Sequence, residues 1–156
     1  MAIVEIMSGL PTTVLSENDA RARFLAEQCA VLGTVTQDGA PHLVPVTFVH
    51  ARVDDVEHLY IAVDHKPKRS TNLKRLRNIA AEPRVSLLVN RYDADWNHLW
   101  WVKVDGHAVV TSFNALPQTL PAVFGAKYAQ YVRVVPDGPV IDVTIDRWTS
   151  WAFAEV

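Results

Sequence analysis

The densest group of residues that could do chemistry is the segment 64–78, with the sequence DHKPKRSTNLKRLRN. It holds six of the chain's fifteen lysines and arginines, namely Lys66, Lys68, Arg69, Lys74, Arg75 and Arg77. We expect a strand end, a turn stiffened by Pro67 and a helix start here, which would gather cations and backbone N–H groups around one point. Three neutral donors could also cap this helix: Ser70, Thr71 and Asn72. Such a point can bind phosphate, and the alternative is a solvated basic helix face.

A second candidate lies at Pro45, between Val44 and Val46. Because proline cannot donate to a β-ladder, the strand that contains it should lie at a sheet edge or be bulged there. Neighbouring backbone groups would then be free to hydrogen-bond a flat heterocycle. An ordinary edge strand protected by its proline is the alternative interpretation.

Aromatic residues gather late in the chain, and Trp100 and Trp101 are adjacent. Neighbouring strand residues point to opposite faces, so one indole should face the core and the other a ligand or a partner subunit. The six histidines have no metal-ligand spacing with each other or with Cys29, so no metal site is expected. Cys29 lies in an apolar run and is predicted to be buried.

No catalytic residue can be assigned from motifs. The chain has no Gly-x-Ser-x-Gly elbow, no P-loop and no glycine-rich dinucleotide turn. His42 and His65 are weak candidates for acid–base roles. If the protein is an enzyme, a coenzyme is expected to carry the chemistry while the protein positions it.

The elements that must position these residues are mostly strands. A helix should begin after the cap Ser16, and a second should end before Pro83. Asp38-Gly39 predicts a hairpin turn, and Asp105-Gly106 predicts a turn or bulge. A helical region over 115–131 should be broken by two prolines. Six strands are expected over residues 29–36, 41–49, 58–63, 84–90, 99–110 and 141–154. This order favours a mainly β fold with short helices, an antiparallel barrel rather than a parallel α/β sheet.

Composition sets the broad class. The 156 residues, 49% hydrophobic and 21% charged, are expected to form a single domain over 1–156. The formal net charge of −2 argues against nucleic acid and membrane surfaces as partners. The first residues lack a signal-peptide pattern, and one cysteine cannot form an internal disulfide. A cytoplasmic protein is therefore expected.

In order and spacing, several segments resemble the pyridoxamine-phosphate-oxidase-like superfamily of flavin and deazaflavin oxidoreductases, over about residues 20–155. They are LGTVTQDGAPHLVPV at 32–46, LKRLRNI at 73–79 and EPRVSLLV at 82–89. YDADW at 92–96 with LWWVKVDG at 99–106 resembles an actinobacterial branch of coenzyme F420-dependent enzymes. Two positions depart from the family pattern: Glu82 replaces the usual Asn before Pro83, and Arg75 stands where many relatives carry Lys.

The resemblance implies a six-stranded split β-barrel that forms a homodimer with two coenzyme sites at the subunit interface. The coenzyme phosphate would lie against the basic helix, the ring along the second strand, and further lysines would suit the polyanionic tail of F420. The matching positions are Val44, Pro45, Val46, Lys66, Lys68, Lys74, Arg75 and Asn78. The implied function is hydride transfer between F420 and a small organic acceptor. The alternatives are an FMN-dependent oxidase or reductase, and a coenzyme-binding or storage protein without turnover.

Overall fold

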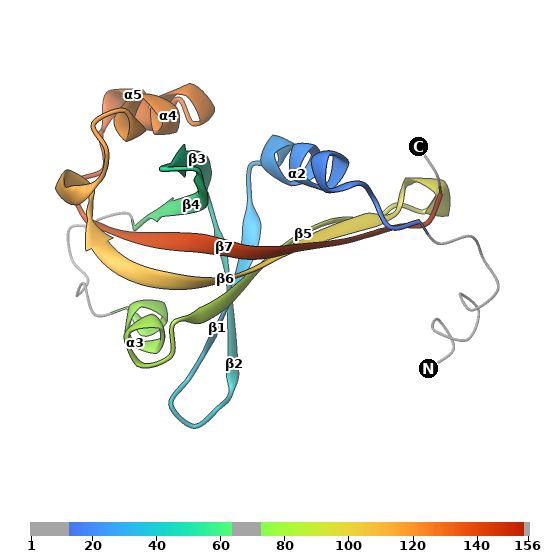
Figure 1. Ribbon diagram of the computed structural model, residues 1–156, viewed down its shortest axis with the longest axis horizontal. Coiled ribbons are helices and arrows are strands. Elements are labelled where there is room, and N and C mark those ends of the chain that lie inside the picture. Colours follow the sequence, from blue (N-terminus) through green and yellow to red (C-terminus); the bar gives the residue numbers. More distant parts are fainter. Residues whose placement is uncertain (1–12, 64–72, 155–156) are drawn as a thin grey trace.

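The computed structural model describes residues 13–63 and 73–154, and these form one antiparallel seven-stranded sheet. Its strand order is β2-β1-β5-β6-β7-β4-β3 (Figure 1). The strands are β1 (Ala30–Val35), β2 (Pro41–Val46), β3 (Val49–Val53), β4 (Val56–Ala62), β5 (Arg84–Arg91), β6 (Trp100–Ser112) and β7 (Pro139–Ala152). The mainly β split-barrel fold predicted from the sequence is thereby confirmed, with one strand more than expected.

The additional strand arises because the predicted strand 41–49 is broken. β2 ends at Val46 and β3 starts at Val49, so the chain leaves one edge of the sheet and enters the other. β3 then pairs with β4 through a tight turn in which Asp54 and Asp55 both have positive φ. The prediction of six strands was wrong at this point.

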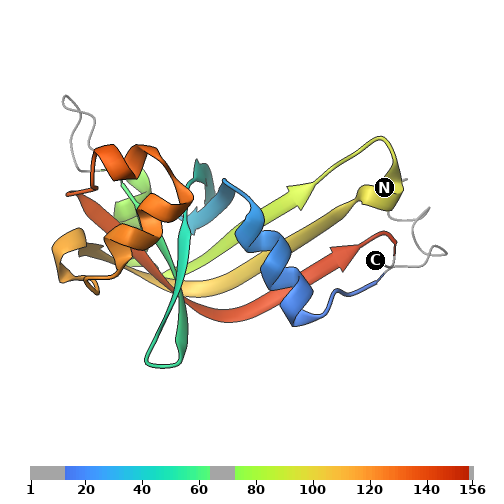
Figure 2. The ribbon, with the colours of Figure 1, turned by 90° about the horizontal axis from the view of Figure 1, so that it is seen from above.

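Short helices close the barrel: α2 (Glu17–Ala26), α3 (Lys74–Ala81), α4 (Leu120–Lys127) and α5 (Gln130–Arg133), with single 3-10 turns η2 (Trp96–His98) and η3 (Phe113–Ala115). α2 and α3 both pack against β6 and lie on opposite sides of the central strands in Figure 1. Figure 2 shows the long strands β5, β6 and β7 side by side beneath α2. No helix among the described residues is long and apolar enough to cross a membrane.

Local sequence signals explain where most elements begin and end. Ser16 caps α2 by accepting a hydrogen bond from the backbone N–H of Asp19 (3.1 Å), as predicted. Gly39 takes the positive φ of 85° that the hairpin turn requires. The predicted irregularity at Asp105-Gly106 is a β-bulge, where a Cβ on Gly106 would collide with the carbonyl oxygen of Thr144.

One other local prediction was wrong. Cys29 is exposed, because it lies in the connection after α2, one residue before the buried alternation of β1 begins at Ala30. The N-cap of α3 is Leu73, which provides no side-chain hydrogen bond, and the predicted capping residues 70–72 lie outside the described residues. As predicted, Trp100 is buried and Trp101 is half-buried on the opposite face of β6.

The sheet has an inner and an outer face. The inner face holds the main core, in which Leu32, Leu87 and Val102 are fully buried, and both α2 and α3 contribute to it. The outer face is the one bearing Trp101 and Asp105. Its closed end lies beneath α4 and α5, which cover a second core cluster: Val49, Tyr60, Ala62, Phe113, Leu120, Phe124, Tyr128, Tyr131 and Val140. Its open end spans β2, β1, β5 and the first half of β6.

Candidate functional site

The register of the β1–β2 hairpin decides which backbone groups of β2 reach the free edge of the sheet. The N–H of Thr36 donates to the carbonyl of Ala40 (2.9 Å), and hydrogen-bonded pairs alternate along an antiparallel ladder. The backbones of Pro41, Leu43 and Pro45 therefore point away from β1. Because proline has no N–H, this edge offers several carbonyl groups and a single donor, the N–H of Leu43.

The three predicted ring-side residues all lie on this edge strand. Val46 is buried and Val44 packs against the main core, whereas Pro45 is exposed on the outer face. The prediction that Pro45 marks an edge strand is confirmed. The sequence analysis missed Leu43, whose side chain is 67% exposed beside Pro45 on the same face. The alternation of β2 is the signal that could have identified it.

A buried hydrogen bond fixes α3 against this hairpin. Asn78 is 5% exposed, and its Nδ2 donates to Oγ1 of Thr34 on β1 (2.9 Å). Thr34 pairs directly with His42 on β2. The structure therefore places Asn78 beside β1, with which its amide is already engaged, whereas the family resemblance assigns Asn78 to the coenzyme phosphate. Its contact with a coenzyme stays a prediction.

The start of α3 is positively charged, and its first turn contains no acidic residue. Lys74 is exposed and Arg75 is half-buried. The pKa of Asp38 in the hairpin turn is lowered mainly by the hydrogen bond from Thr36, then by backbone N–H groups, with a smaller contribution from the charge of Lys74. The helix start and the hairpin turn therefore lie close together. The predicted contacts Lys66 and Lys68 lie outside the described residues.

The open end of the outer face contains a groove of about 540 Å³ between β1, β2, β5 and β6. Its floor includes Gly33, where a Cβ would come within 3.3 Å of the side chain of Leu43. Ser86 on β5 and Asp105 on β6 continue this floor across the sheet. The groove thus begins beside the free edge of β2 and extends across the sheet.

The polar and charged contacts in this groove gather around Asp105. Its carboxylate accepts hydrogen bonds from Ser86 Oγ (2.6 Å) and Arg147 (3.0 Å) and pairs with Lys103 Nζ (2.9 Å). Burial acts to raise the pKa of Asp105, but these three partners outweigh it and hold the pKa below its usual value. The groove floor therefore carries an ionised carboxylate that is paired with two cations.

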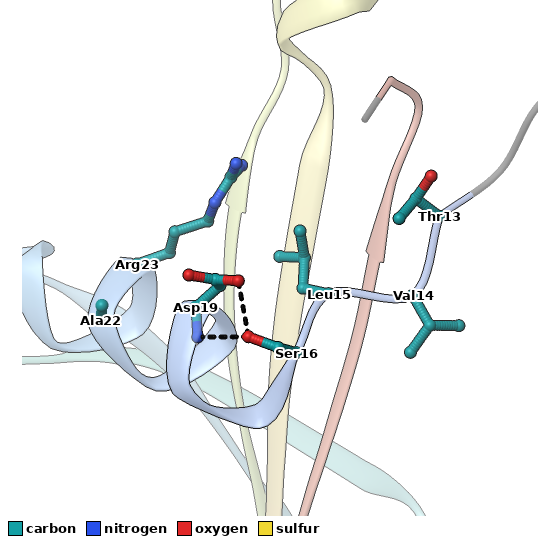
Figure 3. A pocket seen from close by; sticks show the side chains of 7 residues that line it. All are labelled: Thr13, Val14, Leu15, Ser16, Asp19, Ala22 and Arg23. Carbon is teal, nitrogen blue, oxygen red and sulfur yellow. Dashed lines mark hydrogen bonds between the residues drawn. The ribbon is translucent and has the colours of Figure 1, made fainter. Parts of the chain in front are cut away.

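A second hollow, of about 400 Å³, lies at the start of α2 (Figure 3). It is lined by the cap residue Ser16 with its partner Asp19, and by Arg23, whose guanidinium lies over the ring of Trp100 at 5.4 Å. None of the predicted site residues that the structure describes lies here. Its polar groups serve the helix cap and the packing of α2.

Elsewhere, charged side chains are mostly paired within the fold. Glu57 accepts hydrogen bonds from Arg21 Nε (2.9 Å) and lies 2.8 Å from Nε2 of His50. The bond from Arg21 lowers the pKa of Glu57 to about 2 despite its burial. His58 and Asp142 form a similar pair at 2.7 Å. Among the described residues, no three His, Cys, Asp or Glu side chains come together as a metal site would require.

Fold and site together define a split-barrel protein of the flavin-binding oxidoreductase class. Residues 17–152 match the family model described as pyridoxamine 5'-phosphate oxidase, and the chain belongs to this family. Its members are oxidoreductases. The comparison with curated proteins finds no match.

Solved structures share the fold at low sequence identity. A conserved hypothetical protein from Mycobacterium tuberculosis is 19% identical with a TM-score of 0.65, over 90% of this chain and 86% of that one. An FAD-binding protein from Mesorhizobium loti is 18% identical with a TM-score of 0.60, over 94% and 100%. General Stress Protein 26 from Bacillus anthracis is 22% identical with a TM-score of 0.60, over 88% and 94%.

The residues at the hairpin and α3 fit a flavin-type coenzyme. The pyrimidine edge of flavins and deazaflavins carries one N–H between two carbonyl groups. The free edge of β2 matches part of this pattern: the N–H of Leu43 can donate to one ring carbonyl and a backbone carbonyl can accept from the ring N–H, while the second ring carbonyl needs a donor from elsewhere. Lys74 and Arg75 provide cations for a phosphate at the start of α3, where the helix dipole also favours an anion.

Proposed function

We propose that the protein is a coenzyme F420-dependent oxidoreductase that reduces a small organic acceptor. The observation that carries the proposal is that two features lie close together. One is the free backbone edge of β2, at which Leu43 lies between two prolines, and the other is the cationic start of α3. The bound deazaflavin would supply hydride transfer. The chain's own residues would hold the ring along Val44, Pro45 and Val46, and the phosphate at Lys74 and Arg75. Asn78 would position α3 through Thr34.

Charge at the phosphate end favours F420 over a flavin mononucleotide. The first turn of α3 carries Lys74, Arg75 and Arg77 without an acidic residue, and Lys66 and Lys68 precede it in the sequence. One phosphate needs fewer cations, whereas the longer polyanionic tail of F420 would use them. The second candidate is an FMN-dependent enzyme, which the family match favours. In either case the protein is expected to be cytoplasmic.

We further propose that the active form is a homodimer joined across the open end of the outer face. Exposed apolar side chains, Leu43 and Leu88, flank the groove there, and Trp101 lies on the same face. A second copy would cover these side chains and shield the coenzyme edge of β2 from water. Light scattering at micromolar concentration should give twice the chain mass of 17.4 kDa. A mass of 17.4 kDa would refute the dimer.

The substitution Arg75→Ala tests the coenzyme site. A charged hydrogen bond to phosphate contributes about 1.5–3 kcal/mol, so the dissociation constant of F420 should rise about ten- to hundredfold. Fluorescence titration with F420 and, separately, with FMN measures both affinities and ranks the two coenzymes. Added salt should weaken binding, because exposed charges are screened.

Two variants serve as controls on the same helix. Arg77→Ala removes an exposed cation two residues further along, and Lys74→Ala removes the exposed neighbour, so both should weaken binding less than Arg75→Ala. Unchanged affinity in Arg75→Ala and Lys74→Ala would mean that the basic run is only a solvated helix. Tight FMN binding with indifference to F420 would favour the second candidate.

A further inference from the structure

The break between β2 and β3 does not follow from the residues that form it. Val46, Thr47, Phe48 and Val49 all favour strands. In the β1–β2 register, Ala30 pairs with Val46, so the next hydrogen-bonded pair of the ladder would join Gln28 to Phe48. That pair is not formed, and another group takes its place.

The hydroxyl of Tyr128 occupies the position of the missing pair. It accepts a hydrogen bond from the backbone N–H of Phe48 (3.0 Å). The same oxygen lies 2.9 Å from the carbonyl of Gln28 and 3.0 Å from that of Phe48, so its proton can be donated to either. The hydroxyl of Tyr128 therefore lies between the last residues of the two strands, where it satisfies the N–H of Phe48 and one of the two carbonyls at a time.

The surroundings of Tyr128 keep its hydroxyl in this position. Its side chain is buried, and burial raises its pKa, so the hydroxyl stays protonated and remains a donor. Lys127 places its Nζ 3.6 Å from the centroid of the Phe48 ring. Tyr131 packs edge-on against Tyr128 at 5.7 Å, and its hydroxyl lies 3.5 Å from Thr47 Oγ1. Residues of α4 and α5 thus flank the Tyr128 hydroxyl at the end of β2.

We propose that Tyr128 is a positioning residue for the coenzyme: its hydroxyl ends the β1–β2 ladder and fixes the strand edge that receives the ring. The proposal rests on the proposed function, because β2 is the ring-side strand. Without the hydroxyl, the N–H of Phe48 loses its acceptor and the carbonyls of Gln28 and Phe48 lose their donor, so the ends of the two strands separate. This alters the course of β2 within three residues of Pro45. The ring-side edge is thus set by a residue eighty positions away, outside the site itself.

Tyr128→Phe tests this, with Tyr131→Phe as the matched control that removes a hydroxyl from the same cluster. In the coenzyme-free protein, the amides of Val44 and Val46 lie inside the ladder and report the state of β2 by hydrogen exchange. They should exchange at least about tenfold faster in Tyr128→Phe, while the amide of Val102 in β6 keeps its rate. The dissociation constant of FMN, followed by fluorescence, should rise about tenfold, or about 1.4 kcal/mol. Tyr131→Phe should change neither.

The two readouts separate the possible failures. Equal acceleration of all amides, with the FMN affinity of the folded protein unchanged, would show a purely structural hydroxyl and overturn the proposal. Unchanged exchange at Val44 and Val46 would overturn it as well. If the wild-type protein binds neither FMN nor F420, the proposed function fails, and selective acceleration at Val44 and Val46 would still support the role of Tyr128 in setting this strand edge.

Discussion

The two ends of the outer face share the same alternation of side chains along their strands, but they differ in what covers them. At the closed end, outward-facing side chains such as Tyr60 and Val140 are buried beneath α4 and α5. At the open end, Leu43 and Leu88 continue the same strand alternation but remain exposed, and Trp101 is half-buried. The alternation along the strands alone therefore does not decide which side chains are buried. Their burial depends on whether another element covers that end of the sheet.

This difference indicates that the open end is an interaction surface. A sheet face that carries apolar side chains is stable in water when something covers it, and large exposed apolar patches mark interaction sites. Within the described ranges the chain provides a cover for one end only. The proposed second copy would complete the other end and enclose the groove beside β2. The following predictions distinguish an end that the chain's own helices cover from an end that a second copy covers.

The largest expected effect is at the closed end. Phe124 is fully buried there, with its ring 5.6 Å from that of Phe113 and 5.5 Å from that of Tyr131. Phe124→Ala should lower the free energy of unfolding by about 3–5 kcal/mol, because it leaves a cavity among aromatic rings. Urea unfolding at a concentration that keeps the chain monomeric measures this.

Leu43→Ala is the matched change at the open end. Leu43 is mostly exposed, so the monomer should lose no more than about 0.5 kcal/mol. A loss as large as that of Phe124→Ala would show that the open end is already packed within the monomer, and the contrast between the two ends would disappear.

How far the sequence predicts this architecture depends on how local each cause is. The cap at Ser16, the turn at Gly39 and the bulge at Asp105-Gly106 follow from the preferences of the residues themselves, and all three were predicted correctly. The break after Val46 was not predictable in this way. Its cause, the hydroxyl of Tyr128, becomes visible only when the chain is folded.

In the candidate site, too, some features follow from local sequence and others only from how the elements pack. The edge position of Pro45 follows from its missing N–H, whereas the phosphate contact that the family resemblance gives Asn78 stays a prediction. That the Asn78 amide is taken by Thr34 depends on how α3 docks on β1, which no local pattern encodes. The exposure of Cys29 was missed because an apolar neighbourhood in sequence need not be one in space.

At the open end, the next largest effect concerns assembly rather than folding. Leu88 is 37% exposed and pairs across the sheet with Lys103. In Leu88→Lys, two like charges would lie side by side under the second copy and lose their water, so the dissociation constant of the dimer should rise about hundredfold. Sedimentation equilibrium measures it. Val132→Lys, on exposed α5, is the control and should leave assembly unchanged. Equal weakening by both variants would place the interface elsewhere.

Alkaline pH should act on the closed end. Burial, with a smaller contribution from Asp142, raises the pKa of Tyr60 to about 12 from 10.0. The unfolded chain therefore ionises first, so the stabilisation is complete below pH 10 and is lost as the pH rises toward 12. We expect a loss of about 1–2 kcal/mol over this range. Tyr60→Phe should lack this part of the loss in urea unfolding, and an identical alkaline profile in both proteins would contradict the assignment.

Acid pH should act on the open end, with a small effect. The pKa of Asp105 lies below the usual 3.8, since Ser86, Lys103 and Arg147 together outweigh the opposing effect of burial. Its stabilisation is therefore complete above the unfolded pKa and is lost as the pH falls through the lower folded value. Because the group is partly solvated, we expect no more than about 1 kcal/mol at pH 7 between the wild type and Asp105→Asn. Urea unfolding at neutral pH and near pH 2 should show this difference shrinking toward zero. A difference that persists unchanged in acid would mean that Asp105 acts through hydrogen bonds its neutral form also makes, and the charge at the groove floor would then have no part in holding the open end together.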